Sequence, residues 1–109
     1  MTVGELKAAL DLTAFSLPAP DREIVGGYAG DLLSWVMGRA EPDSAWMTIM
    51  SNRNIVAVAT LSDVSAIILT EGVEPDDGVA ELALSRGVNL LGSRETTFAL
   101  SQRLAVLSK

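Results

Sequence analysis

The segment from Asp21 to Trp35 constrains the fold of this chain more than any other part of its sequence. It begins with a charged pair, continues through a short β-branched run, and places three glycines within positions 26–30, directly ahead of Asp31 and an apolar stretch. This order predicts a strand over Glu23–Tyr28, a tight glycine turn, and a helix with Asp31 as its N-cap. Such a turn brings backbone N–H groups close to a bound anion.

The composition predicts one domain and argues against several kinds of function. A chain of 109 residues that is 49% hydrophobic is long enough for one buried core, so we expect a single domain over residues 1–109. The net charge is −6 and the basic residues are scattered, so a nucleic-acid-binding surface is not expected. No apolar run approaches the length of a membrane span, and the first residues lack the order of a signal peptide. These features indicate a cytoplasmic protein without membrane contact.

The sequence contains neither histidine nor cysteine. Disulfides, thiolate chemistry, Cys/His zinc sites and a histidine general base are therefore excluded. No G-x-x-x-x-G-K-[ST] motif is present, and Gly26–Gly30 does not match G-x-G-x-x-G, so neither nucleotide-binding signature supports an enzyme. We expect no catalytic residues, no cofactor and no metal site.

Helix signals and apolar runs alternate along the chain. Thr2 and Glu5 have the spacing of a capping box, which predicts a short N-terminal helix, and a short strand is expected after it over Leu12–Ser16. Four longer strands are expected over Glu23–Tyr28, Ala45–Met50, Ser65–Thr70 and Val88–Leu91, with helices beginning at Asp31, at Ser51 or Asn52, after Asp77 and at Ser93. This alternation predicts an α/β fold, namely a mostly parallel four-stranded sheet with flanking helices. The first helix and the first short strand are expected to be peripheral.

In such a sheet, ligands bind where loops lead from the carboxyl ends of strands into helices. The candidate ligand-binding residues are glycines and polar side chains in or beside these loops: Arg22, Gly26, Gly27, Asp31, Ser51, Asn54 and Ser93. If a site exists, Ser51, Asn54 and Ser93 should converge on the glycine turn. The alternative is that Gly26 and Gly27 only permit a tight turn and close packing of neighbouring elements.

Two further residues have alternative interpretations. The Arg22 guanidinium suits a carboxylate or phosphate ligand, but it also suits an ion pair with Asp21, with Asp31 or with a partner subunit. Trp35 falls on the side of its predicted helix opposite Met37, beside Leu32, which predicts an exposed interface patch. The alternative for Trp35 is that a peripheral element such as the first helix covers it.

Three blocks of the sequence resemble the DRTGG domain family. The first is Asp21-Arg22-Glu23-Ile24-Val25-Gly26-Gly27 with its continuation to Met37, the second is Asn54-Ile55-Val56-Ala57-Val58-Ala59, and the third is Ala66 to Gly72. The chain has Glu23-Ile24-Val25 where the motif that names the family has a threonine directly before the two glycines. The resemblance implies a domain similar to the N-terminal domain of HPr kinase/phosphorylase, regulatory or dimerising rather than a kinase.

The sequence thus predicts a non-catalytic regulatory, ligand-sensing or protein-interaction domain that acts as a homodimer. Its expected partner is a small anionic metabolite or another protein. The alternative is a purely structural dimerisation or scaffold module that binds no ligand.

Overall fold

From β2 onward, strands and helices alternate along the chain in the computed structural model, which describes residues 1–107. The strands are β1 (Thr13–Ser16), β2 (Gly27–Ala29), β3 (Ala45–Thr48), β4 (Ala66–Leu69) and β5 (Leu90–Gly92). The helices are α1 (Val3–Ala9), α2 (Leu33–Arg39), α3 (Asn54–Ser62), α4 (Val79–Ser85) and α5 (Thr97–Leu107). None of these helices is long and apolar enough to cross a membrane.

The strands form one sheet in the order β1-β5-β4-β3-β2. Strands β2 to β5 are parallel, which confirms the predicted α/β fold with a mostly parallel sheet. The sheet has five strands rather than four, because β1 pairs antiparallel with β5 and places Thr13 opposite Gly92. The first short strand is therefore part of the sheet and not peripheral to it. Antiparallel pairing on one edge is a common extension of an otherwise parallel sheet.

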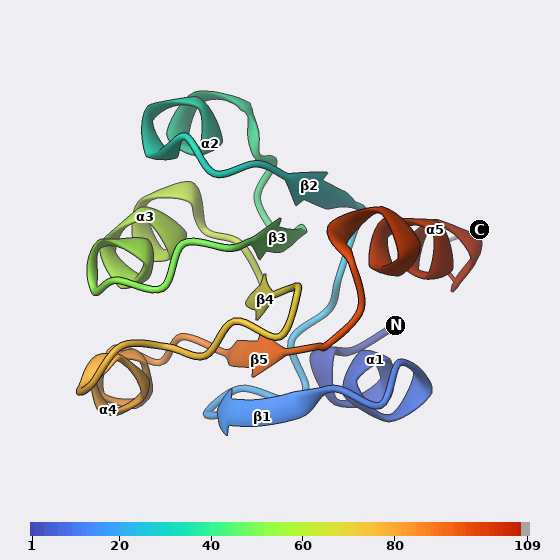
Figure 1. The fold of residues 1–109 in the computed structure, drawn as a ribbon, viewed down its shortest axis with the longest axis horizontal. Coiled ribbons are helices and arrows are strands. Elements are labelled where there is room, and N and C mark those ends of the chain that lie inside the picture. Colours follow the sequence, from blue (N-terminus) through green and yellow to red (C-terminus); the bar gives the residue numbers. More distant parts are fainter. Residues whose placement is uncertain (108–109) are drawn as a thin grey trace.

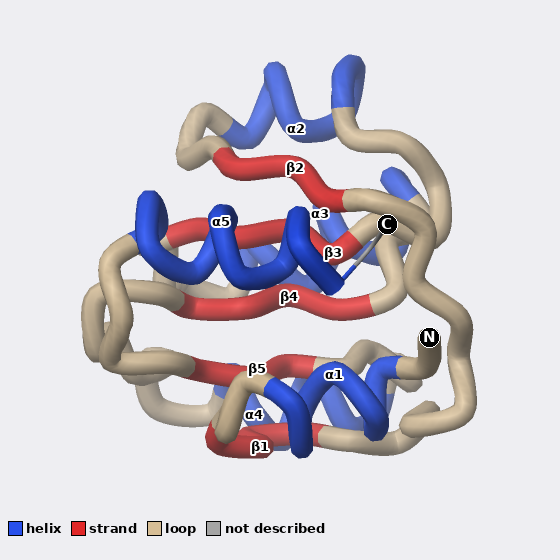
Figure 2. The backbone as a smooth tube through the Cα atoms, turned by 90° about the vertical axis from the view of Figure 1, so that its right-hand side faces the viewer, coloured by secondary structure: helices blue, strands red, loops and turns tan. Residues whose placement is uncertain are grey.

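The sheet lies between two layers of helices, with α2, α3 and α4 on one face and α1 and α5 on the other (Figure 1). Every residue of β3 and β4 is buried, as expected for central parallel strands covered on both faces. Viewed from the side of α1 and α5, β2 forms the upper edge of the sheet and β1 the lower edge (Figure 2). The buried side chains form two clusters, one under each layer of helices.

The N-terminal helix begins with the predicted capping box. The backbone N–H of Glu5 donates to Thr2 Oγ1 at 3.1 Å, and the backbone N–H of Thr2 donates to Glu5 Oε1 at 2.8 Å. These bonds from Thr2 favour the ionised carboxylate and lower the pKa of Glu5 below its ordinary value. Gly87 follows α4 in the left-handed conformation at φ 71°, as its predicted C-cap role requires.

The predicted strand over Glu23–Tyr28 is wrong in its extent. Glu23 instead forms an isolated bridge with Thr2, and the regular strand β2 contains only Gly27–Ala29. The glycine pair is consequently not a turn between a strand and a helix: Gly26 precedes β2 and Gly27 is its first residue. This difference arises because the residues ahead of Gly26 bond to the N-terminus, where Ile24 N–H donates to the Met1 carbonyl at 2.9 Å.

Three predicted helix caps are also wrong. Helix α3 has Arg53 as its N-cap, without a side-chain cap bond, instead of Ser51 or Asn52. Helix α2 has Leu32 as its N-cap without a side-chain hydrogen bond, because the Asp31 carboxylate accepts hydrogen bonds from the end of β3. Helix α5 begins at Thr97 rather than directly after Ser93, whose hydroxyl accepts a bond from Glu95 N–H at 3.0 Å. The Asp31 and Ser93 side chains thus accept hydrogen bonds from loop residues and from the end of a strand, not from the first turn of a helix.

Candidate functional site

The carboxyl ends of the parallel strands meet at one edge of the sheet, where two loops are joined to each other. The backbone N–H of Glu71, after β4, donates to the Glu95 carbonyl at 2.8 Å, and that of Gly72 donates to the Ser93 carbonyl at 2.9 Å. Glu71 and Gly72 both have left-handed backbones, at φ 61° and 76°. The Glu71 carboxylate also accepts a bond from the Thr97 N–H at 2.8 Å. These bonds fix the β4–α4 and β5–α5 loops as one unit.

A cavity of about 490 Å³ lies beside these joined loops. Phe15 and the backbone of Gly92 form part of its wall, and the two are in such close contact that a Cβ on Gly92 would lie 2.5 Å from Phe15 Cε2. The polar part of the wall includes Ser93, Arg94 and Arg103. The cavity is therefore at the edge where ligands bind in open α/β sheets.

The charged groups of the cavity are not equally available to a ligand. Arg103 is engaged, since it forms an ion pair with Glu95 and donates to the Ala9 carbonyl at 3.4 Å. The Arg94 side chain, in contrast, has no ion pair or hydrogen bond within residues 1–107. Two further carboxylates, Asp11 and Glu74, also line the cavity. The cavity is thus lined both by an available cation and by carboxylate acceptors.

The structure separates most of the predicted ligand-binding residues from this cavity. Ser93 lines it, but Ser51 lies beyond β3 and its hydroxyl donates to Asp76 Oδ1 at 2.8 Å. Asn54 is the first residue of α3, and its backbone N–H donates to Asn52 Oδ1 at 2.9 Å. The Asp31 carboxylate accepts the Thr48 hydroxyl at 2.8 Å and the Ile49 N–H at 2.9 Å. The Ser51 and Asp31 side chains are thus bonded elsewhere, and none of these three residues lines the hollow at Gly26 and Gly27.

The two glycines line a different hollow, an apolar groove of about 480 Å³ between β2 and α5. A Cβ on Gly27 would lie 2.8 Å from Leu104 Cδ2 and 3.3 Å from the Ala45 carbonyl oxygen. Gly26 has a positive φ of 75°, and a Cβ there would meet no atom within 4 Å. Gly27 therefore allows α5 to pack closely on the sheet, whereas Gly26 serves the conformation of the backbone.

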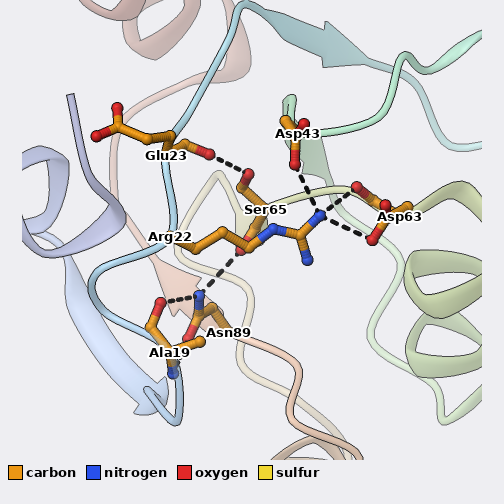
Figure 3. A network of polar contacts seen from close by, with 7 residues as sticks. All are labelled: Ala19, Arg22, Glu23, Asp43, Asp63, Ser65 and Asn89. Carbon is orange, nitrogen blue, oxygen red and sulfur yellow. Dashed lines mark hydrogen bonds and ion pairs between the residues drawn. The ribbon is translucent and has the colours of Figure 1, made fainter.

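Arg22 lies at the amino ends of the strands, opposite the cavity, in a network of polar contacts (Figure 3). Its Nη2 atom donates to Asp43 Oδ1 at 3.0 Å, to Asp63 Oδ1 at 2.8 Å and to the Asp63 carbonyl at 2.6 Å. The predicted pairing with Asp21 or Asp31 is wrong, because the fold brings Arg22 to the turns before β3 and β4. Both aspartates have left-handed backbones, at φ 65° and 56°. Aspartate is one of the few residue types other than glycine that adopt this conformation readily, so both positions suit tight turns.

Burial has the largest influence on the pKa of Arg22 and lowers it, but the hydrogen bonds and charges of Asp43 and Asp63 outweigh this effect and raise the pKa overall. The guanidinium therefore stays charged at every working pH. A neighbouring residue, Asn89, is buried and uses its side chain to bond Ala19 and Ser65, so that the loop before Arg22 is held against the sheet.

Replacement of Arg22 by methionine is expected to lower the free energy of unfolding by about 1 kcal/mol, because it removes ion pairs to two aspartates that are more than half exposed. Urea unfolding monitored by far-UV circular dichroism measures this change. Arg86→Met is the matched control, since Arg86 lies beside the same network and forms no ion pair with any residue from 1 to 107. This substitution should change stability by less than about 0.5 kcal/mol. Equal effects of the two substitutions would contradict a structural role for Arg22.

The predicted interface residues lie on α2 and in the turn before it. Leu32 is 56% exposed and Trp35 is 51% exposed, and the Arg39 guanidinium lies 3.6 Å from the centroid of the Trp35 ring. The alternative that the first helix covers Trp35 is wrong, because α1 lies on the opposite face of the sheet (Figure 1). The patch is thus accessible in the single chain, and its role in association stays a prediction.

A search of solved structures identifies a similar fold in the CBS and DRTGG domains of the regulatory region of the Clostridium perfringens pyrophosphatase, solved in complex with the activator diadenosine tetraphosphate. The TM-score is 0.72 at 14% sequence identity, and the similarity covers 94% of this chain and 45% of that chain. This chain therefore spans less than half of that regulatory region. No curated protein matches the sequence.

A comparison with models of protein families also identifies a DRTGG domain in this chain. The model of the DRTGG domain matches residues 32–107, which include α2 to α5 and three of the parallel strands. The match begins after Asp21–Gly27, so the first part of the first resembling block lies outside it. Since the matched range covers most of the sequence, this chain belongs to the DRTGG domain family.

Proposed function

We propose that this chain is a non-catalytic regulatory domain that binds a small anionic ligand and acts as a homodimer. The observation that carries the proposal is the cavity at the carboxyl ends of β4 and β5, which is lined by Arg94, a residue whose side chain has no ion pair or hydrogen bond within residues 1–107. Arg103 supports this assignment, because its ion pair neutralises Glu95 and leaves Arg94 as the cation available to an anion.

The other groups of the cavity narrow the class of ligand. Asp11 and Glu74 accept hydrogen bonds but repel a second anionic group, so they favour a ligand that also carries hydroxyl or amino donors. Phe15 adds an apolar wall held against Gly92. A phosphorylated compound with a sugar or an aromatic base meets these requirements. The similar regulatory region from Clostridium perfringens was solved with a nucleotide activator, which makes diadenosine tetraphosphate the first ligand to test.

A regulatory function without catalysis is supported by the side chains that the sequence lacks. The chain has no histidine or cysteine, and it has no phosphate-binding loop motif with its lysine. Within residues 1–107, no group of His, Cys, Asp and Glu side chains is arranged to hold a metal ion. The cavity therefore lacks the histidine or cysteine on which the commonest acid–base and nucleophilic mechanisms depend.

Ligand binding is expected to raise the melting temperature of the chain. Diadenosine tetraphosphate, ATP, a sugar phosphate and inorganic phosphate are compared by differential scanning fluorimetry. A ligand present at 100 times its Kd stabilises the folded state by about 2.7 kcal/mol, which corresponds to a shift of several degrees for a domain of this size. Arg94→Gln should abolish the shift without lowering the melting temperature of the free protein, because Arg94 has no partner in the described chain.

The control for this experiment is Arg53→Gln, since Arg53 lies at the start of α3 and away from the cavity. It should retain the full shift. No shift with any of the four compounds, or a full shift in Arg94→Gln, would contradict the proposed ligand site.

A dimerisation module without a ligand is the second candidate function. It is favoured by the half-exposed side chains of Leu32 and Trp35, which present an apolar patch beside the edge strand β2. A dimer that shows no thermal shift with any ligand would support this candidate over the first.

A further inference from the structure

The edge strand β1 is irregular at a residue that lines the ligand cavity. Ala14 pairs with Leu91 of β5. The next pair along the strands is Ser16 with Leu90, so one residue of β1, Phe15, is left without a partner of its own. A β-bulge of this kind redirects a side chain, and such bulges are frequent at sheet edges and beside active sites. Here the bulged residue is one of those that line the cavity at the carboxyl ends of β4 and β5.

Gly92 provides the space that the Phe15 ring occupies. A Cβ on Gly92 would lie 2.5 Å from Cε2 and 3.1 Å from Cζ of Phe15, so a side chain at this position would displace the ring. The ring also packs against the buried cluster under α2, α3 and α4, and it is itself only partly buried. Among the described residues that line the cavity, Phe15 alone is aromatic. The cavity therefore has one aromatic ring in its wall, held in place by the sheet and by the core.

The residue that seats this ring lies close to the available cation. Arg94, whose side chain has no ion pair or hydrogen bond within residues 1–107, follows Gly92 by two residues. Two residues of fully extended chain span at most about 7 Å. The N–H of Ser93 between them donates to the Leu69 carbonyl at 2.8 Å, which fixes this segment to the sheet. A ligand in which one sugar separates an aromatic ring from an anionic group suits this spacing.

We propose that Phe15 is the specificity-determining residue of this cavity, and that its ring stacks on the aromatic base of a nucleotide whose phosphate binds Arg94. This assignment rests on the ligand site of the proposed function and names the ligand class, since a sugar phosphate has no base to stack. Every nucleobase has a π face, so Phe15 distinguishes nucleotides from sugar phosphates rather than one base from another. Phe15 lies outside residues 32–107, the range matched by the family model, so base recognition belongs to the N-terminal segment.

Isothermal titration calorimetry of the full chain with adenosine 5′-monophosphate and with ribose 5-phosphate tests this assignment, because the two ligands differ by the base. The wild-type chain is expected to bind the nucleotide about tenfold more tightly, as one stacked base contributes. Phe15→Leu keeps an apolar side chain without the ring, and should reduce the ratio of the two dissociation constants to about one while ribose 5-phosphate binds as before. Phe15→Tyr keeps the ring and should keep the ratio.

The matched control is Phe98→Leu, since Phe98 is 82% exposed on α5 and does not line the cavity. It should keep the wild-type ratio. Far-UV circular dichroism checks that each variant is folded, and Phe15→Met replaces Phe15→Leu if the latter is not.

Three results would overturn the role of Phe15. The first is equal binding of the two ligands by the wild-type chain, and the second is a ratio that Phe15→Leu leaves unchanged. The third is a ratio that Phe15→Tyr loses as completely as Phe15→Leu, because the ring would then not be what binds the base. All three leave the Arg94 site intact. Binding of neither ligand also overturns the role of Phe15, and the thermal shifts with diadenosine tetraphosphate and inorganic phosphate then decide separately on the proposed ligand site.

Discussion

Replacement of Trp46 by alanine is expected to lower the free energy of unfolding by about 3–5 kcal/mol. Trp46 is fully buried in β3, opposite Tyr28 of β2, and belongs to the core under α2, α3 and α4. Its indole Nε1–H donates to the Gly30 carbonyl at 2.9 Å, and so ties the loop before α2 to the sheet. The loss is a large part of the stability of a domain of this size. Urea unfolding monitored by far-UV circular dichroism measures it.

Two comparisons separate the packing of Trp46 from its hydrogen bond. Trp46→Phe keeps an aromatic ring but leaves the Gly30 carbonyl without its donor, and is expected to cost about 1–3 kcal/mol. Trp35→Phe is the surface control, because Trp35 is half exposed, and it should change stability by less than about 0.5 kcal/mol. A cost of Trp46→Ala no greater than that of the surface control would contradict the placement of Trp46 in the core.

Replacement of Gly27 by valine is expected to lower the free energy of unfolding by about 1–3 kcal/mol. The new Cβ would lie 2.8 Å from Leu104 Cδ2 and 3.3 Å from the Ala45 carbonyl oxygen. Leu104 is almost fully buried, so α5 must shift away from β2 to admit the side chain. Thermal unfolding of the variant and the wild-type chain measures the loss.

Gly38→Ala is the matched control for this overpacking. Gly38 lies in α2, and a Cβ there would meet no atom within 4 Å. Alanine in a helix is favoured over glycine by about 0.5–1 kcal/mol, so this substitution should raise the melting temperature. If Gly27→Val proved as harmless as Gly38→Ala, the close contact of α5 with β2 would be wrong.

The regular elements that the sequence predicts well are those with strong local signals. The capping box at Thr2 and Glu5 and the apolar runs before and after α3 carry their own evidence for a helix and for buried strands. The alternation of these elements is sufficient for the α/β class and a mostly parallel sheet. β1 was expected to be peripheral because its four residues carry no signal for a partner, and only the antiparallel pairing with β5 makes it the fifth strand.

The candidate sites were less predictable because they depend on contacts between distant segments. Arg22 is recognisable as a polar residue of interest, but Asp43 and Asp63, its partners, are 21 and 41 residues away. Ser93 was identified from its position after a strand, whereas Arg94 beside it was missed. Arg94 stands out because its side chain has no acidic partner within residues 1–107. This property depends on the positions of the neighbouring side chains, so the sequence alone does not show it.

The glycines at positions 26 and 27 show the division between sequence and tertiary structure most directly. The sequence by itself determined the α/β class and the order of an extended segment, small residues and a helix. It also carried the resemblance to the DRTGG domain family. Only the tertiary structure decided that Gly26 precedes β2 and Gly27 begins it, and that Gly27 packs against Leu104 of α5. The physical reason is that backbone propensity and periodicity are local, whereas the space that a missing side chain leaves is defined by elements nearly 80 residues further along the chain.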